Sequence, residues 1–301
     1  MNNFTLLAAT DFSEASRRAI DRAALLADGL RLRRIELVHV VSRGSLKALK
    51  RLFSSEAGSL EARLLEEATV ELHRLTDRVG DQFGIESGSF VAIGNPAGEI
   101  ADYADRLSAI LLVLGARGTN AARDLLLGTT AENVIRRTHR PVLVVRGDPA
   151  RPYRSVLAAT DFSAQSAAAM NLAQTLAPQA SMALLHAVEL PFEGKLQYAG
   201  VAAETVSRYR AQAERAAEIQ ARDFASRAAF DGTVRVEYGY PPRVIREQME
   251  GTRPDLVAVG KHGQSAIEEL LIGSVSAHVL ANAACDVLVA GQPAAAAAPA
   301  A

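Results

Sequence analysis

The chain has 301 residues, of which 49% are hydrophobic and 22% charged, so it is long enough to bury two substantial cores. Its formal net charge of -1 provides no global field that favours nucleic acid or an anionic membrane as a partner. A single cysteine excludes an intrachain disulfide framework, and the absence of an apolar stretch of about 20 residues argues against a membrane-spanning helix.

The chain contains a long internal repeat. The heptapeptide LAATDFS at residues 7–13 returns unchanged at residues 157–163. This period is too long for a solenoid, so each copy is expected to be a domain. We expect the first domain at residues 1–146, a Gly- and Pro-containing linker at 147–153, the second domain at 154–291 and a disordered Ala/Pro tail at 292–301.

Strand and helix signals alternate within the first repeat. Apolar runs bounded by turn residues predict strands, and a periodic apolar face predicts a helix. Ser13 is expected to cap a helix that ends at Gly29, and the polar, partly basic stretch 42–59 is interpreted as an irregular insertion. The other expected elements are strands at 3–9, 34–41, 88–93, 109–114 and 141–145, and helices at 60–79, 96–107 and 130–138.

The second repeat gives the same order of signals. This alternation predicts an α/β fold in which helices cover both faces of a parallel sheet with right-handed crossovers. Ligands of such sheets bind beyond the carboxyl ends of the strands, where the strand order reverses. The expected strands are 155–159, 181–188, 234–238, 256–259 and 287–290, and the expected helices are 163–176, 205–229, 242–250 and 275–282.

A glycine motif follows the fourth strand of each repeat. The first copy has Gly115 and Gly118, then nine residues, then Gly128 followed by Thr129 and Thr130. The second copy has the same spacing in Gly260, Gly263, Gly273 and Ser274. Glycine lets a backbone turn sharply and lets a ligand approach without meeting a Cβ atom. The alternative is that these glycines form ordinary turns and bind nothing.

The motif suits an anion because its last glycine opens a helix. A helix start has unpaired N–H groups and a partial positive charge, so phosphate binds there readily. The hydroxyls of Thr129 and Ser274 can cap that helix or reach the ligand. Arg117, Lys261 and His262 lie inside the loops and can contact phosphate oxygens, although solvated loop charges explain them nearly as well.

An aspartate follows the first strand of each repeat. If the strand order reverses between the first and fourth strands, Asp11 or Asp161 meets the glycine loop in one crevice that a nucleotide can span. A carboxylate there can accept hydrogen bonds from a ribose or a base, or it can stabilise the turn alone. His39 and His186 end the second strands and are interpreted as packed core residues, and Cys285 as an inert thiol.

Several familiar catalytic patterns do not occur in the sequence. It has no Gly-x-x-x-x-Gly-Lys-[Ser/Thr] loop and no Gly-x-Gly-x-x-Gly after the first strand. It also lacks a Gly-x-Ser-x-Gly elbow and a Cys/His/Asp cluster with metal-ligand spacing. We therefore assign no catalytic residue and no metal site.

The motif Gly-x2-Gly-x9-Gly-[Ser/Thr], together with the strand-one aspartate, resembles the universal stress protein family in tandem form. Residues 128–145 are especially close, and residues 94–96 and 239–241 match the family's turn before the third helix. The resemblance covers nearly the whole chain. It implies two Rossmann-like domains of the adenine nucleotide-binding type, each with a five-stranded parallel sheet in the order 3-2-1-4-5, paired through strand five.

The resemblance also implies binding residues, because some members of the family bind ATP through this motif and others have lost it. Asp11 and Asp161 would contact the adenosine part, with Val40 and Ala187 near the base. The phosphates of ATP, alone or with Mg²⁺, would be held by the loop glycines together with Thr129, Thr130, Ser274 and Val275. Three positions depart from the pattern: Ile110 in place of a strand-four aspartate, Asp286 in place of a proline, and Ala187, which can loosen the second base pocket.

Three hypotheses of function follow. The first is a cytoplasmic ATP-binding stress protein that acts as a regulatory switch towards an unknown protein partner, consistent with an N-terminus that lacks signal-peptide features. The second is a nucleotide-free scaffold whose fifth strands pair the two repeats as an intramolecular pseudo-dimer and join a second chain in a homodimer. The third is a slow ATPase or an autophosphorylating enzyme.

Overall fold

The computed structural model describes residues 5–52, 57–117, 127–190, 199, 201–263 and 271–291. The elements of the first repeat are β1 (Leu6–Thr10), α1 (Glu14–Gly29), β2 (Arg34–Ser42), α2 (Arg43–Leu52), α3 (Ala57–Phe83), β3 (Glu86–Gly94), α4 (Pro96–Arg106), β4 (Leu111–Gly115), α5 (Thr129–Arg137) and β5 (Val142–Val145). Those of the second are β6 (Ser155–Ala159), α6 (Ala164–Leu176), β7 (Ser181–Val188), α8 (Ala203–Arg227), β8 (Thr233–Tyr238), α9 (Pro241–Thr252), β9 (Leu256–Gly260), α10 (Ser274–Asn282) and β10 (Asp286–Ala290).

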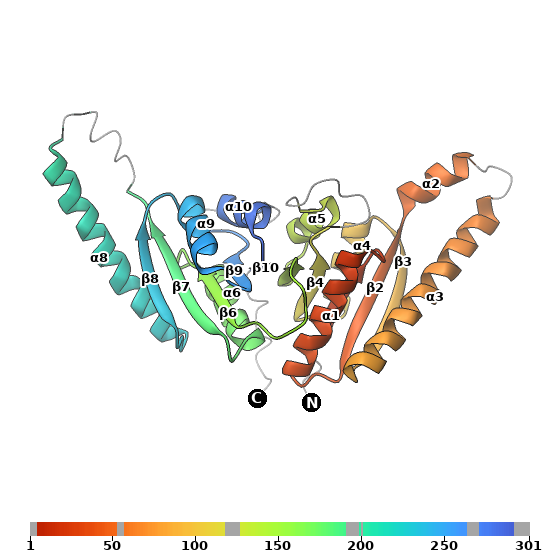
Figure 1. Cartoon of the computed structure of the whole chain (residues 1–301). Helices are drawn as coiled ribbons and strands as arrows, with labels where there is room; N and C mark the ends of the chain where they lie inside the picture. The colour runs from red at the N-terminus through yellow and green to blue at the C-terminus, as the bar shows by residue number, and fades with distance from the viewer. Residues whose placement is uncertain are drawn as a thin grey trace, which may run out of the picture.

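The strands form one continuous ten-stranded sheet with the order β3-β2-β1-β4-β5-β10-β9-β6-β7-β8 (Figure 1). Each half has the order 3-2-1-4-5, and its neighbouring strands are parallel. The halves meet where β5 and β10 pair antiparallel, with Leu143 opposite Leu288. The predicted fold class and the pairing of the repeats through strand five are therefore confirmed.

Helices cover both faces of the sheet because successive strand residues point to opposite sides. Leu6 and Ala8 of β1 pack into a core with residues of α1 and α3, and this core continues into the second repeat. Leu7 and Ala9 pack into a second core with α4, α5, α9 and α10. Strands buried on both sides explain the nearly continuous apolar runs in the sequence.

The stretch 42–59 is where the sequence-based expectation was wrong. Residues 43–52 form α2, and α3 begins at Ala57, so the expected irregular insertion is largely helical. Four cationic residues among the ten of α2 favoured the interpretation as a polar insertion. Leu46 is nonetheless 5% exposed, which shows that one apolar side chain anchors α2. The predicted disordered tail at 292–301 lies outside the described residues.

The sheet order places the reversal beside the first strand of each repeat. β1 pairs with β2 on one side and with β4 on the other, and β6 lies in the same way between β7 and β9. The turn after the first strand and the loop after the fourth strand therefore leave the same edge of the sheet side by side. Ligands of open α/β sheets bind at this position.

A buried ionic cluster joins the second repeat to α1 and to the segment between the repeats. Arg22 is 4% exposed and Asp286 1% exposed, and Arg22 Nε lies 3.2 Å from Asp286 Oδ2. Tyr153 donates its hydroxyl hydrogen to the same oxygen at 2.7 Å, and the backbone N–H groups of Arg146 and Gly147 donate to Oδ1 at 2.7 and 2.9 Å. Asp286, which replaces a proline of the family pattern, thus holds the connecting segment.

Candidate functional site

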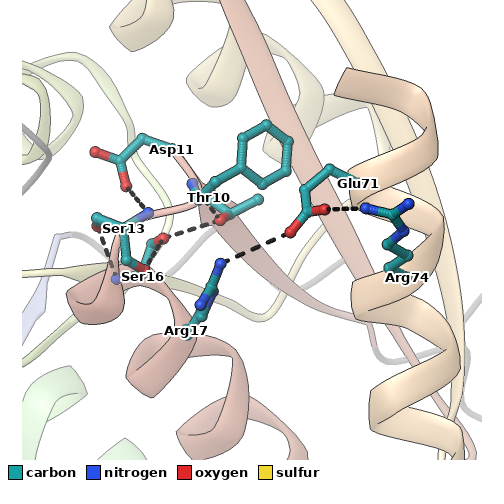
Figure 2. Close-up of polar contacts among 8 residues, drawn as sticks. Thr10, Asp11, Ser13, Ser16, Arg17, Glu71 and Arg74 are labelled. Carbon is teal, nitrogen blue, oxygen red and sulfur yellow. Dashed lines mark hydrogen bonds and ion pairs between the residues drawn. The ribbon is translucent and has the colours of Figure 1, made fainter. Parts of the chain in front are cut away.

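The turn after β1 has a fixed and unusual backbone. Phe12 has φ of 65°, in the left-handed region that a bulky residue rarely occupies. Its N–H donates to Thr10 Oγ1 at 2.9 Å, and the N–H of Ser13 donates to Asp11 Oδ1 at 3.1 Å (Figure 2). The predicted turn-stabilising role of Asp11 therefore exists, and it involves Oδ1.

Hydroxyl groups tie this turn to the start of α1. Thr10 Oγ1 and Ser16 Oγ lie 2.9 Å apart, and Ser16 N donates to Ser13 Oγ at 3.2 Å, so Ser13 caps α1 as predicted (Figure 2). The second repeat reproduces the arrangement. Thr160 Oγ1 and Ser166 Oγ are also 2.9 Å apart, and Phe162 also has φ of 65°. Thr10 and Ser16 were not expected to have this role, although the repeat offers a signal: Thr10 lies in the repeated heptapeptide, and Ser166 repeats Ser16 three residues beyond its end.

The histidines at the ends of the second strands support the same turns. His39 Nδ1 lies 2.8 Å from Thr10 O, and His186 Nδ1 lies 2.8 Å from Thr160 O. Because a carbonyl oxygen only accepts, Nδ1 carries the hydrogen. Each ring stacks on the phenylalanine of its turn with ring centroids 4.2 Å apart. Burial lowers the pKa of His39 and His186, which agrees with the expected role as packed, hydrogen-bonded residues.

The first glycine of each motif is needed for packing between the strand and a helix. A Cβ atom on Gly115 would lie 2.8 Å from the backbone carbonyl group of Ala15, and one on Gly260 would lie 2.9 Å from Ser166 N. The fourth strand of each repeat thus touches the first turn of the first helix. At these two positions the approach of a helix is a reason for glycine that does not depend on a ligand.

The second glycine of the second motif, Gly263, lies next to Asp161. A Cβ atom on Gly263 would lie 2.8 Å from Asp161 Oδ2, so the second glycine loop and the strand-one carboxylate meet as the crevice argument predicted. Gly118, the corresponding glycine of the first motif, lies outside the described residues. The first loop is described up to Arg117, which is half-buried.

The helices α5 and α10, called the cradle helices below, begin directly after the third glycine of each motif. Gly128 and Gly273 are the N-cap residues, and their N–H groups donate to Ala116 O and Lys261 O at 2.8 Å each. Thr129 and Ser274 are already the first helical residues, so the expectation that their hydroxyls cap the helices is wrong. Because a glycine cap has no side chain, the first-turn N–H groups receive no side-chain cap. Thr129, Thr130 and Ser274 are exposed there, and Val275 is half-buried.

The two residues expected near a base lie at the same edge of the sheet. Val40 and Ala187 are half-buried near the carboxyl ends of β2 and β7. Both pack against the core that contains α5 and α10. The smaller side chain of Ala187 leaves the second repeat with less apolar surface at this point.

The charged residues of the second loop are engaged with the protein itself. Lys261 is 4% exposed, and its Nζ donates to Arg136 O and Thr138 O at 2.8 and 3.1 Å. It is neither a solvated loop charge nor directed at the crevice, which corrects the sequence-based interpretation. The ring of His262 hydrogen-bonds through Nε2 to Leu271 O, just before α10.

Cys285 is not a nucleophile at neutral pH. Burial raises the pKa of its thiol to about 12, so the reactive thiolate does not form there. None of the helices in the described ranges is both long and apolar enough to cross a membrane.

Comparison with known proteins places this geometry in a family. The model of the universal stress protein family matches residues 3–146 and again residues 152–291. The chain belongs to the universal stress protein family. Its tandem form, expected from the glycine motifs, is therefore confirmed.

Individual relatives match one repeat or the whole chain. The chain is 26% identical over 153 residues to universal stress protein MJ0577 of Methanocaldococcus jannaschii, covering 47% of this chain and 93% of that protein. It is 32% identical over 138 residues to universal stress protein G of Escherichia coli, covering 44% and 90%. A universal stress protein structure from Archaeoglobus fulgidus has a TM-score of 0.67 at 19% identity and covers 97% of this chain and 100% of that one, which supports the tandem fold.

Proposed function

We propose that this universal stress protein binds ATP in each repeat and acts as a nucleotide-dependent switch. In each proposed domain, residues 1–146 and 154–291, ATP would lie between the strand-one turn and the glycine loop. The observation that carries the proposal is the contact geometry of Gly263 with Asp161, because it brings a carboxylate and a glycine loop to the same edge of the sheet.

The phosphate end of the site is the start of the cradle helix. In the first repeat the exposed Thr129 and Thr130 begin α5, and in the second the exposed Ser274 begins α10. Backbone N–H groups and the helix dipole at such a position favour a triphosphate. The amides of Gly128 and Gly273 already bond to the protein, so the binding donors are those of the residues that follow.

The adenosine end of the site is the strand-one turn. Asp11 and Asp161 each use Oδ1 within the turn, at 3.1 Å from Ser13 N and Ser163 N. Oδ2 of Asp161 lies on the side of Gly263, where a ribose hydroxyl can donate to it. Val40 and Ala187 offer apolar surface to a base from the neighbouring strands. Arg117 and His262 complete the proposed set from within the loops.

Switching requires that ATP bind two states of the loops unequally. The strand-one turns are held by hydroxyl networks and stacked rings, whereas the glycine loops connect the ends of β4 and β9 to the cradle helices. ATP spanning both would fix the loop relative to the rigid turn. The surface formed by the loop then changes with occupancy, and an unknown protein partner would recognise that change.

The strand pairing restricts how a nucleotide-free scaffold could assemble with a second chain. β5 pairs with β4 and β10, and β10 pairs with β9 and β5, so the fifth strands have no edge left for a second chain. A homodimer would have to use another surface. The third hypothesis, a slow ATPase or autophosphorylating enzyme, would use the same crevices and is tested by phosphate release.

Equilibrium dialysis with labelled ATP tests the proposal. Gly263→Ala forces Asp161 Oδ2 to move, since the new Cβ atom would lie 2.8 Å from it, and this costs little stability because a carboxylate end can rotate. We expect this variant to lose ATP from the second site. Gly251→Ala is the matched control, because nothing lies within 4 Å of its added Cβ atom.

The first site is tested by Gly118→Val, whose side chain should close that loop to a phosphate. Unchanged ATP stoichiometry in both the Gly118→Val and Gly263→Ala variants would show that the cradle is assigned wrongly. Failure of the unmodified protein to retain ATP would favour the scaffold. Phosphate release that persists in the Gly118→Val, Gly263→Val double variant would not arise from these loops.

A further inference from the structure

Lys261 belongs by its backbone to the second glycine loop. Its N–H donates to Ala290 O at 2.6 Å, which fixes the loop against the end of β10. Its carbonyl oxygen accepts from Gly273 N at 2.8 Å, and Gly273 is the N-cap of α10. The main chain of Lys261 therefore forms part of the cradle of the second repeat.

The side chain of Lys261 crosses to the first repeat. Its Nζ donates to Arg136 O at 2.8 Å and to Thr138 O at 3.1 Å, at the end of α5. Carbonyl groups in the last turn of a helix lack intrahelical partners, and a cation there interacts favourably with the helix dipole. A lysine buried to 4% exposure in this position holds the end of α5 firmly.

The opposite end of α5 is the cradle of the first repeat. The helix has nine residues, so about 13 Å of helix lie between the end that Lys261 contacts and the start at the exposed residues Thr129 and Thr130. A shift of the second glycine loop would pull on the end of α5 and tilt its start. Lys261 thus contacts the N-cap of α10 through its carbonyl oxygen and the far end of α5 through its ammonium group.

Ala116, the position of the first loop that corresponds to Lys261, cannot make an equivalent contact with α10. Ala116 O accepts from Gly128 N at 2.8 Å, as Lys261 O does from Gly273 N, but its methyl side chain cannot reach across. The end of α10 is instead held by Arg146, whose guanidinium donates to Leu280 O. Arg146 follows β5 and is not part of a glycine loop, so at the paired positions Ala116 and Lys261 the side chain crosses only from the second repeat to the first.

We propose that Lys261 is a positioning residue for the first nucleotide site and couples the two sites. ATP in the second cradle fixes the loop of residues 260–263, Lys261 then holds α5, and the first cradle binds ATP more tightly. This inference rests on the proposed function, because it assumes that both cradles take ATP. By linkage, ATP in the first site strengthens the second by the same factor.

An ATP titration followed through the backbone amide resonance of Thr130 reads the first site alone. We expect the first site to bind about fivefold more weakly when Gly263→Val closes the second site, since couplings of this kind begin near that size. In the Lys261→Met background the same closure should change the first-site affinity less than about twofold. Met has a similar length and no donor, so packing is kept and the crossed hydrogen bonds are lost.

Three further variants separate coupling from general damage. Lys261→Arg keeps a cationic donor and should retain the coupling, whereas Lys261→Gln, with a shorter side chain, should lose it and replaces Lys261→Met if that variant does not fold. Arg140→Met removes a cation near the same end of α5, one that pairs with Asp105 at 2.8 Å, and should leave the coupling unchanged.

The outcomes distinguish a failure of the coupling through Lys261 from a failure of ATP binding itself. If Lys261→Met retains the fivefold difference, or if Gly263→Val leaves the first-site affinity unchanged in the natural sequence, the coupling is overturned while ATP binding stands. If ATP moves no Thr130 resonance in the natural sequence, the proposed function fails at the first site and the coupling fails with it.

Discussion

The turn after the first strand is the same in both repeats, whereas the side chains that join the repeats differ. Thr10 and Thr160 lie at the same distance, 2.9 Å, from the serine of the following helix. The residues that join the two repeats differ from the residues at the equivalent positions of the other repeat. The equivalent pairs are Asp286 and Pro141, Lys261 and Ala116, and Arg22 and Leu172. Two copies in one chain can diverge where they touch each other while each keeps the geometry of its own crevice.

The largest effect is expected at the junction. Asp286→Ala leaves Arg22 buried without its carboxylate and removes the acceptor of Tyr153 and two backbone amides. Breaking a buried pair by removing one partner costs about 3–5 kcal/mol. Urea unfolding measures this loss. The exposed pair of Asp105 and Arg140 is the control, and Asp105→Ala should cost less than about 1 kcal/mol.

Equal losses of unfolding free energy in Asp286→Ala and Asp105→Ala would contradict this prediction. The residues that join the repeats would then contribute no more to the free energy of unfolding than an exposed ion pair within one repeat.

The next effect tests the repeated packing of strand and helix. Gly115→Ala and Gly260→Ala each drive a Cβ atom to within 2.8 and 2.9 Å of helix backbone, which must shift. Overpacking of this kind costs about 1–3 kcal/mol, and we expect similar losses in thermal or urea unfolding for the two repeats. Gly80→Ala in α3, with nothing within 4 Å, should instead stabilise the protein by about 0.5–1 kcal/mol.

A smaller effect tests the repeated hydroxyl network. Thr10→Val and Thr160→Val remove the acceptor of the Phe12 or Phe162 N–H and the partner of a buried serine. An unsatisfied buried group costs about 1–3 kcal/mol, and we expect a value near the lower end because both turns are partly exposed. Two free energies of unfolding that differ by more than about 1 kcal/mol would show that the turns are not equivalent.

The smallest effect is a pH dependence shared by the two repeats. Burial lowers the pKa of His39 and His186 below the ordinary value of 6.5, against the opposing effects of a backbone hydrogen bond and of Asp11 or Asp161. The unfolded chain therefore binds protons more readily, so this contribution to stability is present above pH 6.5 and is lost as the pH falls through the folded pKa.

Urea unfolding at about pH 7.5 and about pH 5.5 measures this slope. The double variant His39→Gln, His186→Gln should show a shallower fall than the natural sequence. An identical fall would assign the acid sensitivity to other groups.

The repeat itself explains why much of the fold could be predicted. Strands buried on both faces give apolar runs that are easily recognised, and the duplicated heptapeptide and glycine spacing locate the turn after the first strand and the loop after the fourth strand of each repeat. The helix α2 was missed because four of its ten residues are cationic, although the described Leu46 is buried.

The joining residues could not be predicted because their partners are distant in the sequence and have no counterpart in the other repeat. Nothing near Asp286 in the sequence indicates Arg22 or Tyr153 as its partner. Lys261 lies in a motif where a cation suggests phosphate, and only the pairing of β5 with β10 brings the end of α5 within reach of it. For Gly115 and Gly260 the sequence suggested only the approach of a ligand, because it does not show that helix backbone lies against both positions.

The central claim is that the exposed starts of α5 and α10 receive the triphosphate. Amide chemical shifts recorded on the full chain with ATP, and separately with adenosine, test it most directly. We predict that ATP moves the resonances of Thr129, Thr130, Ser274 and Val275, and that adenosine moves chiefly those near Asp11 and Asp161. Shifts confined to other surfaces, or first-turn resonances that respond equally to adenosine and ATP, would contradict the account.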